Sequence, residues 1–247
     1  MNKKIIIANW KMQLDYQQSL ALAKKIRTKI AVDNCEVVLC PDFTALTGVN
    51  QILKGGSIKL GAQDCFWQER GAYTGEVAPQ NLKKIGCQLV ILGHSERRKY
   101  CHEDDKIVRN KLAAVLAVKN LTPVVCIGEM EKKNTAARNL LLKKQVQNIF
   151  SDLKINNRII IAYEPSWAIC TGEVIGAKDL AVAVENIVQE IARVTGNAAK
   201  YFSIIYGGSI ATENVASIIK VPGVSGLLVG GASLDVNKFY KIIKQVC

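Results

Sequence analysis

The feature that most constrains this chain is a rhythm of short apolar runs that recurs along its 247 residues. Each run is almost continuously apolar and rich in β-branched residues, and polar residues do not alternate with apolar ones. That pattern is typical of strands buried on both faces, as in a parallel sheet. Eight runs occur, at residues 5–8, 36–40, 58–62, 89–92, 124–127, 159–162, 202–205 and 227–229.

Helical periodicity fills the intervals between these runs. Apolar residues recur every three or four positions with lysines between them, which predicts helices that each bury one face. The predicted helices span residues 17–30, 44–53, 79–85, 105–119, 136–153, 177–194, 212–219 and 235–246. Pro79 suits a first helical turn, and Thr212, Asp235 and Ser95 are expected N-caps.

Eight strand–helix units in 247 residues average roughly 31 residues each, the size of a βα repeat. Such units close either as a doubly wound open sheet or as an eightfold barrel. The even unit size, the count of eight and the chain length favour the barrel. The predicted fold class is therefore α/β, a (β/α)8 barrel of eight parallel strands each followed by a helix. No linker-like stretch divides the chain, so residues 1–247 are expected to form one domain.

Composition excludes several classes of protein. The longest uncharged run, between Lys220 and Asp235, is rich in glycine and serine and too short to span a bilayer. The apolar stretch near the N-terminus is too short for a secretory signal, which predicts a cytoplasmic protein. The eight cysteines form no C-x-x-C pair and there are only two histidines, so neither a metal site nor a disulfide framework is expected. The cysteines are expected to be buried apolar thiols.

A net charge of +12 raises the question of an anionic partner. The basic residues occur in twos and threes along the predicted helices, without a long basic arm or interleaved aromatics. This distribution favours solvated outer helix faces over a nucleic-acid surface, so no nucleic-acid partner is expected.

Polar residues follow the predicted strands at the edge that would form the mouth of a barrel, where such barrels carry their chemistry. Asn9 and Lys11 follow the first strand, His94 the fourth and Glu164 the sixth. Each alone could be an ordinary strand-end residue. Together on one rim they supply a carboxylate base, a neutral imidazole donor and a cation.

Glycine-rich turns follow the last two strands, around Ser209 and at Gly230 and Gly231. Glycine lets backbone N–H groups approach an anion, and the turn after strands seven and eight is the usual phosphate site of such barrels. These turns therefore predict a phosphate-binding site, although tight turns alone would also select glycine.

Motifs in this order and spacing resemble the triosephosphate isomerase family along the whole chain. They are Ala-Asn-Trp-Lys at 8–11, Gly-Ala-Tyr-Thr-Gly-Glu at 71–76, Gly-His-Ser-Glu-Arg-Arg at 93–98, Cys-Ile-Gly-Glu at 126–129, Ala-Tyr-Glu-Pro at 162–165, Tyr-Gly-Gly-Ser at 206–209 and Leu-Val-Gly-Gly-Ala-Ser-Leu at 228–234. The resemblance implies interconversion of dihydroxyacetone phosphate and D-glyceraldehyde 3-phosphate through an enediolate, in glycolysis and gluconeogenesis, with no cofactor.

The resemblance also implies a role for each site residue. Glu164 would be the base, neutral His94 the electrophile, Lys11 and Asn9 substrate contacts, and Glu96 a supporting charge. Cys170, Ser209, Gly230, Gly231, Ile169 and Leu228 would bind the substrate or its phosphate. A lid over residues 165–176 would include Pro165, Ser166, Trp167, Thr171 and Gly172 and would exclude water. Thr74 would reach a neighbouring active site across a homodimer.

The lid departs from the family pattern at two positions. Ser166 stands where the family has an apolar residue, and Cys170 stands where it has the glycine whose N–H meets the phosphate. A side chain restricts backbone angles that glycine allows, so Cys170→Gly is expected to tighten substrate binding or to speed turnover.

Two other functions are compatible with parts of the sequence. A different phosphate-binding barrel, such as a lyase or an aldolase, would share the glycine turns, but a Schiff-base aldolase needs a buried lysine and no predicted strand interior carries one. A nucleic-acid binder would explain the positive charge and would bind with a steep salt dependence.

Overall fold

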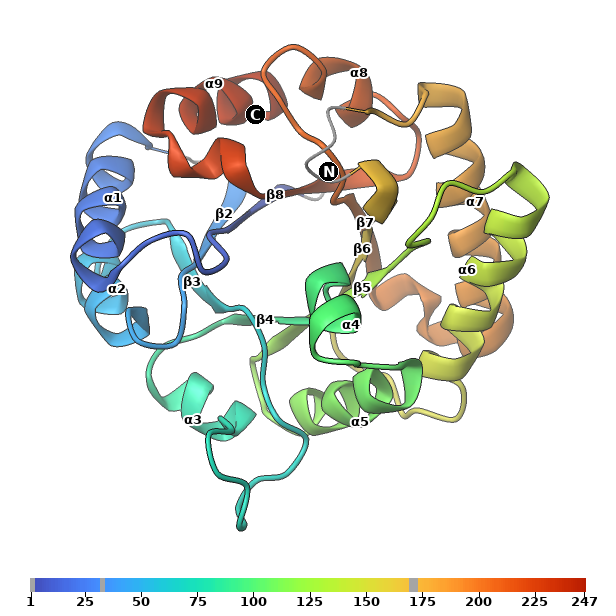
Figure 1. Ribbon diagram of the computed structural model, residues 1–247, viewed down its shortest axis with the longest axis horizontal. Helices are drawn as coiled ribbons and strands as arrows, with labels where there is room; N and C mark the ends of the chain where they lie inside the picture. The colour runs from blue at the N-terminus through green and yellow to red at the C-terminus, as the bar shows by residue number, and fades with distance from the viewer. Residues whose placement is uncertain (1–2, 32–33, 169–172) are drawn as a thin grey trace.

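The computed structural model describes residues 3–31, 34–168 and 173–247. Eight strands in sequence order form a closed barrel in which every strand pairs with its neighbours in parallel and β8 pairs with β1 (Figure 1). The strands are β1 (Lys4–Asn9), β2 (Cys35–Cys40), β3 (Lys59–Ala62), β4 (Leu89–Leu92), β5 (Thr122–Ile127), β6 (Ile159–Tyr163), β7 (Phe202–Tyr206) and β8 (Val224–Val229). The predicted barrel is therefore confirmed.

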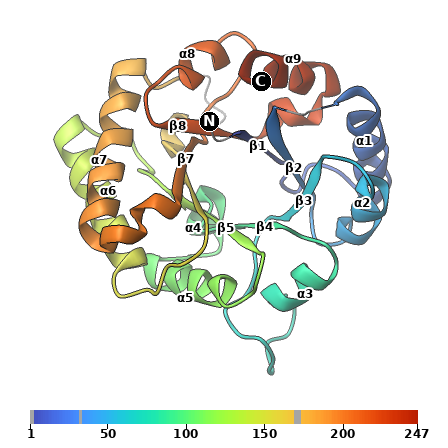
Figure 2. The same cartoon turned by 180° about the vertical axis from the view of Figure 1, so that it is seen from behind.

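Helices surround the barrel on all sides, as Figure 2 shows from behind. They are α1 (Tyr16–Lys29), α2 (Leu46–Leu53), α3 (Pro79–Lys84), α4 (Ser95–Tyr100), α5 (Asp105–Leu116), α6 (Thr135–Phe150), α7 (Ala177–Thr195), α8 (Val215–Ile219) and α9 (Val236–Val246). The 3-10 helices within the described residues are η1 (Ser166–Ala168), η2 (Gly196–Tyr201) and η3 (Gly231–Leu234).

The helix predictions hold except at a few ends. Two helices, α4 and α5, follow β4, and α4 begins within the motif at 93–98, where the expected N-cap at Ser95 had indicated a helix start. Asp235 caps α9 and Pro79 opens α3 as predicted. Thr212 does not cap a helix, because α8 begins only at Val215.

Two apolar layers explain why the strand runs are continuously apolar. One layer fills the barrel interior, with side chains such as Ile7, Ile91 and Ile160. The other lies between the strands and the helices, with side chains such as Ile6, Val90 and Ile161. Successive residues of one strand point to opposite faces, so both faces are buried and polar residues remain only at the strand ends.

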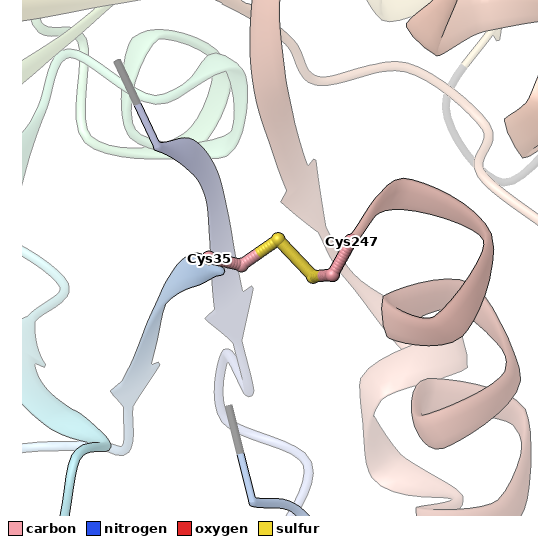
Figure 3. The surroundings of a disulfide bond; sticks show 2 residues. All are labelled: Cys35 and Cys247. Atoms are coloured by element: carbon pink, nitrogen blue, oxygen red, sulfur yellow. A yellow bond between two sulfur atoms is a disulfide. The ribbon is translucent and has the colours of Figure 1, made fainter. Parts of the chain in front are cut away.

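One disulfide corrects the prediction for the cysteines. Cys35, at the start of β2, is bonded to Cys247, directly after α9, across a sequence separation of 212 residues (Figure 3). Barrel closure brings these two segments together, and spacing along the sequence carries no trace of that proximity. Four other cysteines are buried thiols as predicted, namely Cys40, Cys65, Cys87 and Cys126. Cys101 is also a free thiol, but it is exposed. Cys170 lies outside the described residues.

Across the described ranges, no helix combines the length and apolar character that crossing a membrane requires.

Candidate active site

A cavity of about 320 Å³ opens at the C-terminal ends of the strands. Strands and loops that are distant in the sequence contribute to its wall. Eight of the predicted site residues line it: Asn9, Lys11, His94, Glu164, Ser209, Leu228, Gly230 and Gly231. The structure therefore brings together the residues that the sequence placed on one rim.

Glu164 follows β6 and is 2% exposed. Its Oε2 accepts a hydrogen bond from the Ser95 N–H at 3.1 Å. Its Oε1 has no hydrogen-bond partner among the described residues and lies 3.2 Å from Nε2 of His94. Gly207 packs directly against the carboxylate, since a Cβ on that glycine would lie 2.9 Å from Cγ of Glu164. One oxygen is thus held in place while the other keeps its lone pairs for a proton.

His94 is itself the N-cap of α4, so the prediction that Ser95 has this position is wrong. The Nδ1 atom accepts a hydrogen bond from the Glu96 N–H at 3.2 Å. A ring nitrogen that accepts a hydrogen bond carries no proton, so the proton of a neutral imidazole lies on Nε2. That Nε2–H group lines the cavity beside Glu164.

Lys11 has a left-handed backbone, with φ of 55°, and its ammonium group lies 2.6 Å from Oε1 of Glu96. Two side chains fix this backbone. Oδ1 of Asn9 accepts the Lys11 N–H at 3.1 Å, and Nε2 of Gln63 donates to the Lys11 carbonyl at 2.9 Å and to the Cys40 carbonyl at 3.0 Å. The site predictions did not include Gln63, although it follows β3 directly, and strand-end position is the signal that could have indicated it.

The glycine turn after β8 lies beside this cation. A Cβ built on Gly230 would lie 3.5 Å from Cε of Lys11, whereas one on Gly231 would meet open space. The first turn of η3 begins at Gly231. An anion in this corner would meet backbone N–H groups and an ammonium group together. Ser209, after β7, donates its hydroxyl to the Ala168 carbonyl and so links this corner to η1.

The predicted lid begins on a buried hydrogen-bond network. Glu129, which is 1% exposed, accepts hydrogen bonds from Tyr163 Oη at 3.1 Å and from Trp167 Nε1 at 2.9 Å. Its backbone carbonyl accepts the Ser166 N–H at 2.9 Å. Burial, together with the Glu129 carboxylate, raises the pKa of Tyr163 far above its usual range. The first residues of the predicted lid, Pro165 to Trp167, are therefore held in place by Glu129. The predicted lid and substrate residues Ile169, Cys170, Thr171 and Gly172 lie outside the described residues.

Thr74 lies away from the cavity. It is exposed in the loop between β3 and α3, which extends from the barrel at the bottom of Figure 1.

A buried group of charges beside the site was not predicted. Nζ of Lys111, 2% exposed, lies 2.7 Å from Oδ1 of Asp64 and 2.5 Å from Oε1 of Glu103. Arg97 lies 2.9 Å from Oδ2 of Asp64. Burial raises the pKa of Asp64 to about 6 against the attraction of Lys111. Lys111 is buried on α5 and held by two carboxylates, so it is no free amine for a Schiff base.

Within the part of the chain that the structure describes, no group of three histidine, cysteine, aspartate or glutamate side chains is placed to hold a metal ion.

Comparison with known proteins agrees with this geometry. Residues 4–246 match the family described as Triosephosphate isomerase. The triosephosphate isomerase of Thermoanaerobacter pseudethanolicus is 38% identical, covering 98% of this chain and 99% of that protein. Those of Moorella thermoacetica (39% identity, 98% of each chain) and Dehalococcoides mccartyi strain CBDB1 (40%, covering 99% of this chain and 97% of that protein) are similar. The chain belongs to the triosephosphate isomerase family.

Proposed function

We propose that this protein interconverts dihydroxyacetone phosphate and D-glyceraldehyde 3-phosphate, with Glu164 as the base. The observation that carries the proposal is the buried Glu164 carboxylate, whose Oε1 has no hydrogen-bond partner among the residues that the structure describes and lies 3.2 Å from Nε2 of His94. A base and a hydrogen-bond donor so close together can act on adjacent atoms of one small substrate.

In this mechanism Oε1 of Glu164 takes a proton from the carbon next to the carbonyl group. The Nε2–H of His94 donates to the carbonyl oxygen, which becomes an enediolate oxygen. The same carboxylic acid then returns its proton to the neighbouring carbon. Nε2 of His94 gives its proton to the former carbonyl oxygen and takes the proton of the adjacent hydroxyl group, which becomes the new carbonyl, so both Glu164 and His94 end in their starting states and the sum of atoms is unchanged. Asn9 and Lys11 contact the substrate oxygens, and Glu96 holds the ammonium group of Lys11 at 2.6 Å. A fixed cation stabilises the developing negative charge most where water is excluded.

The substrate phosphate binds at the turns of Ser209, Gly230 and Gly231, with Leu228 as the apolar wall between them and Glu164. The lid segment, residues 165–176, closes over the site; Ile169 and Cys170 contact the substrate in this proposal. Lid closure would keep water from the enediolate, which can otherwise eliminate its phosphate.

The direct test is a coupled assay of glyceraldehyde 3-phosphate conversion with wild type and Glu164→Asp. Shortening the side chain by one methylene withdraws the carboxylate from the substrate carbon, and kcat is expected to fall by about 10²–10³-fold with little change in KM. Glu36→Asp, a matched change at the opposite end of the barrel, is the control and should retain full kcat. Equal kcat in wild type and Glu164→Asp would contradict the assignment of the base.

We also propose that two copies of the chain form a dimer through the face that carries Thr74. Met12, after β1, is 92% exposed, Phe43, after β2, is 41% exposed, and Tyr73, next to Thr74, is 44% exposed. The loops that follow the first three strands therefore carry apolar surface that a monomer leaves in water. Tyr73 packs on Phe66 with ring centroids 4.6 Å apart, which stiffens the extended loop. Light scattering should give twice the chain mass for the wild type and the single-chain mass for Thr74→Arg; a monomeric wild type would refute the dimer.

We place the enzyme in the cytoplasm, where the glycolytic and gluconeogenic reactions of this family supply and consume its substrates.

A further inference from the structure

Arg138 is a buried cation without a full set of partners. It lies in the first turn of α6 and is 4% exposed. Its Nη1 lies 3.4 Å from Oδ1 of Asp179, while Nε and Nη2 have no hydrogen-bond partner among the described residues. An unpartnered buried donor costs about 1–3 kcal/mol, so a guanidinium kept here needs a compensating interaction.

The buried face of α6 carries Arg138 two turns before the residue that contacts the end of β5. Seven residues further along the same face, Gln145 donates to the Gly128 carbonyl at 3.2 Å and accepts the Gly128 N–H at 2.9 Å. Gly128 immediately precedes Glu129. Seven helical residues span about 10 Å, or two turns, so Arg138 lies two turns from the end of β5, toward the loop layer that contains Glu129 and Trp167.

Glu129 needs a cation of this kind. Its carboxylate is buried, yet its hydrogen-bond donors, Tyr163 Oη and Trp167 Nε1, are both neutral. Lys132 covers the outer face of the Trp167 indole, with Nζ 4.8 Å from the ring centroid, and it is paired with Glu173 at 2.8 Å. On the buried side, the charge of Arg138 acts on the same network: it lowers the pKa of Tyr163 in opposition to burial and Glu129, which raise it.

Arg138 also contacts the helix that follows the lid segment. Asp179 lies in the first turn of α7, which begins directly after Gly176. Its side chain is 56% exposed, whereas the side chain of Arg138 is 5% exposed. Through its contact with Asp179, the buried Arg138 therefore fixes the first turn of α7.

We infer that Arg138 is a positioning residue for the isomerase reaction. Its guanidinium balances the buried charge of Glu129 and binds Asp179, and it thereby holds η1 and the start of α7 in register with Glu164. The inference rests on the proposed roles of Glu164 and the lid segment. It adds a requirement for a cation on α6 at a residue that does not touch the cavity.

The test compares Arg138→Met, which keeps the length but removes the charge, with Arg138→Lys, which keeps the charge. Both are made in protein labelled with 5-fluorotryptophan, where the resonance of Trp167 is assigned among the three tryptophans by Trp167→Phe. Arg138→Met is expected to lower kcat by about tenfold, because a small misplacement near the reacting atoms costs that much or more. It should also shift the Trp167 resonance, and Arg138→Lys should restore both readouts.

Arg193→Met is the matched control, because Arg193 is an exposed arginine paired with Glu190 on α7. It should change neither kcat nor the fluorine spectrum. If Arg138→Met does not fold, Asp179→Asn removes the exposed partner instead and should lower kcat by a few fold and shift the Trp167 resonance, in proportion to the weaker contact.

The inference is overturned if the variants lower the melting temperature while kcat and the Trp167 resonance stay at wild-type values, since Arg138 would then be purely structural. A failure of the proposed function looks different: Glu164→Asp would retain kcat whatever happens at Arg138.

Discussion

At the mouth of the barrel, polar groups are held where they cost folding free energy, whereas at the floor they are paired and cross-linked. The mouth, at the C-terminal ends of the strands, has Lys11 with φ of 55° and Glu164, one oxygen of which has no partner in the described part of the chain. At the floor, where the strands begin, Glu36 accepts hydrogen bonds from Lys59 at 2.9 Å and Arg158 at 2.7 Å. The same barrel thus keeps strained, available groups at one end and satisfied groups at the other.

The difference teaches where each property of the enzyme resides. Strain and unpartnered groups persist in a fold only when the surrounding structure enforces them, and they concentrate at functional sites. The disulfide and the Glu36 ion pairs supply stability at the end that performs no chemistry. Changes at the mouth should therefore alter activity more than stability, and changes at the floor should do the opposite.

The largest expected effect comes from removing the same charge at each end. Lys11→Met should lower kcat/KM by about 10³-fold, because it removes the cation beside the Gly230 turn, where we propose that the phosphate binds, and should change the free energy of unfolding by less than about 1 kcal/mol. Lys59→Met should leave kcat/KM unchanged and lower stability by about 1 kcal/mol through its pair with Glu36. Steady-state kinetics and urea unfolding measure both. Similar losses of kcat/KM in the two variants would break the comparison.

The disulfide at the floor gives the next largest effect. Cys247→Ser should lower the free energy of unfolding by about 4 kcal/mol, because the bond closes a very long loop in the unfolded chain. The kcat should not change, since both sulfur atoms lie away from the mouth. Urea unfolding at one protein concentration, with and without dithiothreitol, measures the loss.

Cys101→Ser, at an exposed free thiol, is the control and should not alter stability. Dithiothreitol should make the wild type as unstable as Cys247→Ser. Loss of kcat in Cys247→Ser at temperatures where it stays folded would show that the two ends of the barrel are coupled.

The features that the sequence predicts correctly are those that leave a local pattern in it. The strands could be located because burial on both faces leaves a local signal, an apolar run such as Ile159–Tyr163. Glu164, His94 and Lys11 could be located because barrel closure places every strand end on one rim. In both cases the sequence shows a local pattern, and the closure of eight parallel strands into a barrel then determines where the residues of that pattern lie.

The rest depended on contacts between distant segments, for which no local pattern exists. Cys35 and Cys247 meet only because β2 and α9 become neighbours on closure. The sequence gives no sign that Lys111 is buried, because its partner Asp64, 2.7 Å away, is distant along the chain. His94 and not Ser95 is the N-cap of α4 because the His94 ring accepts the Glu96 N–H. The general preference of serine for N-cap positions could not predict that hydrogen bond.

The smallest predicted effect, a dependence of stability on pH, has opposite signs at the two ends. On the mouth side, burial raises the pKa of Asp64 to about 6 from 3.8, against the attraction of Lys111 and Arg97 and with the repulsion of Glu103. The folded state then binds the proton more tightly than the unfolded state, so the carboxyl group destabilises the fold increasingly as pH rises from about 4 to 6, by up to about 3 kcal/mol.

At the floor, burial alone would raise the pKa of Glu36, but its ion pairs with Lys59 and Arg158 lower it, so its stabilising effect is lost as pH falls below about 4.5. Urea unfolding between pH 3 and pH 7 should show two opposite trends. The stability of wild type relative to Asp64→Asn should fall as pH rises, and its stability relative to Glu36→Gln should fall as pH drops. Parallel slopes for the two variants would mean that buried charge at the mouth is as well compensated as charge at the floor, and the contrast between the two ends would then rest on Lys11 and Glu164 alone.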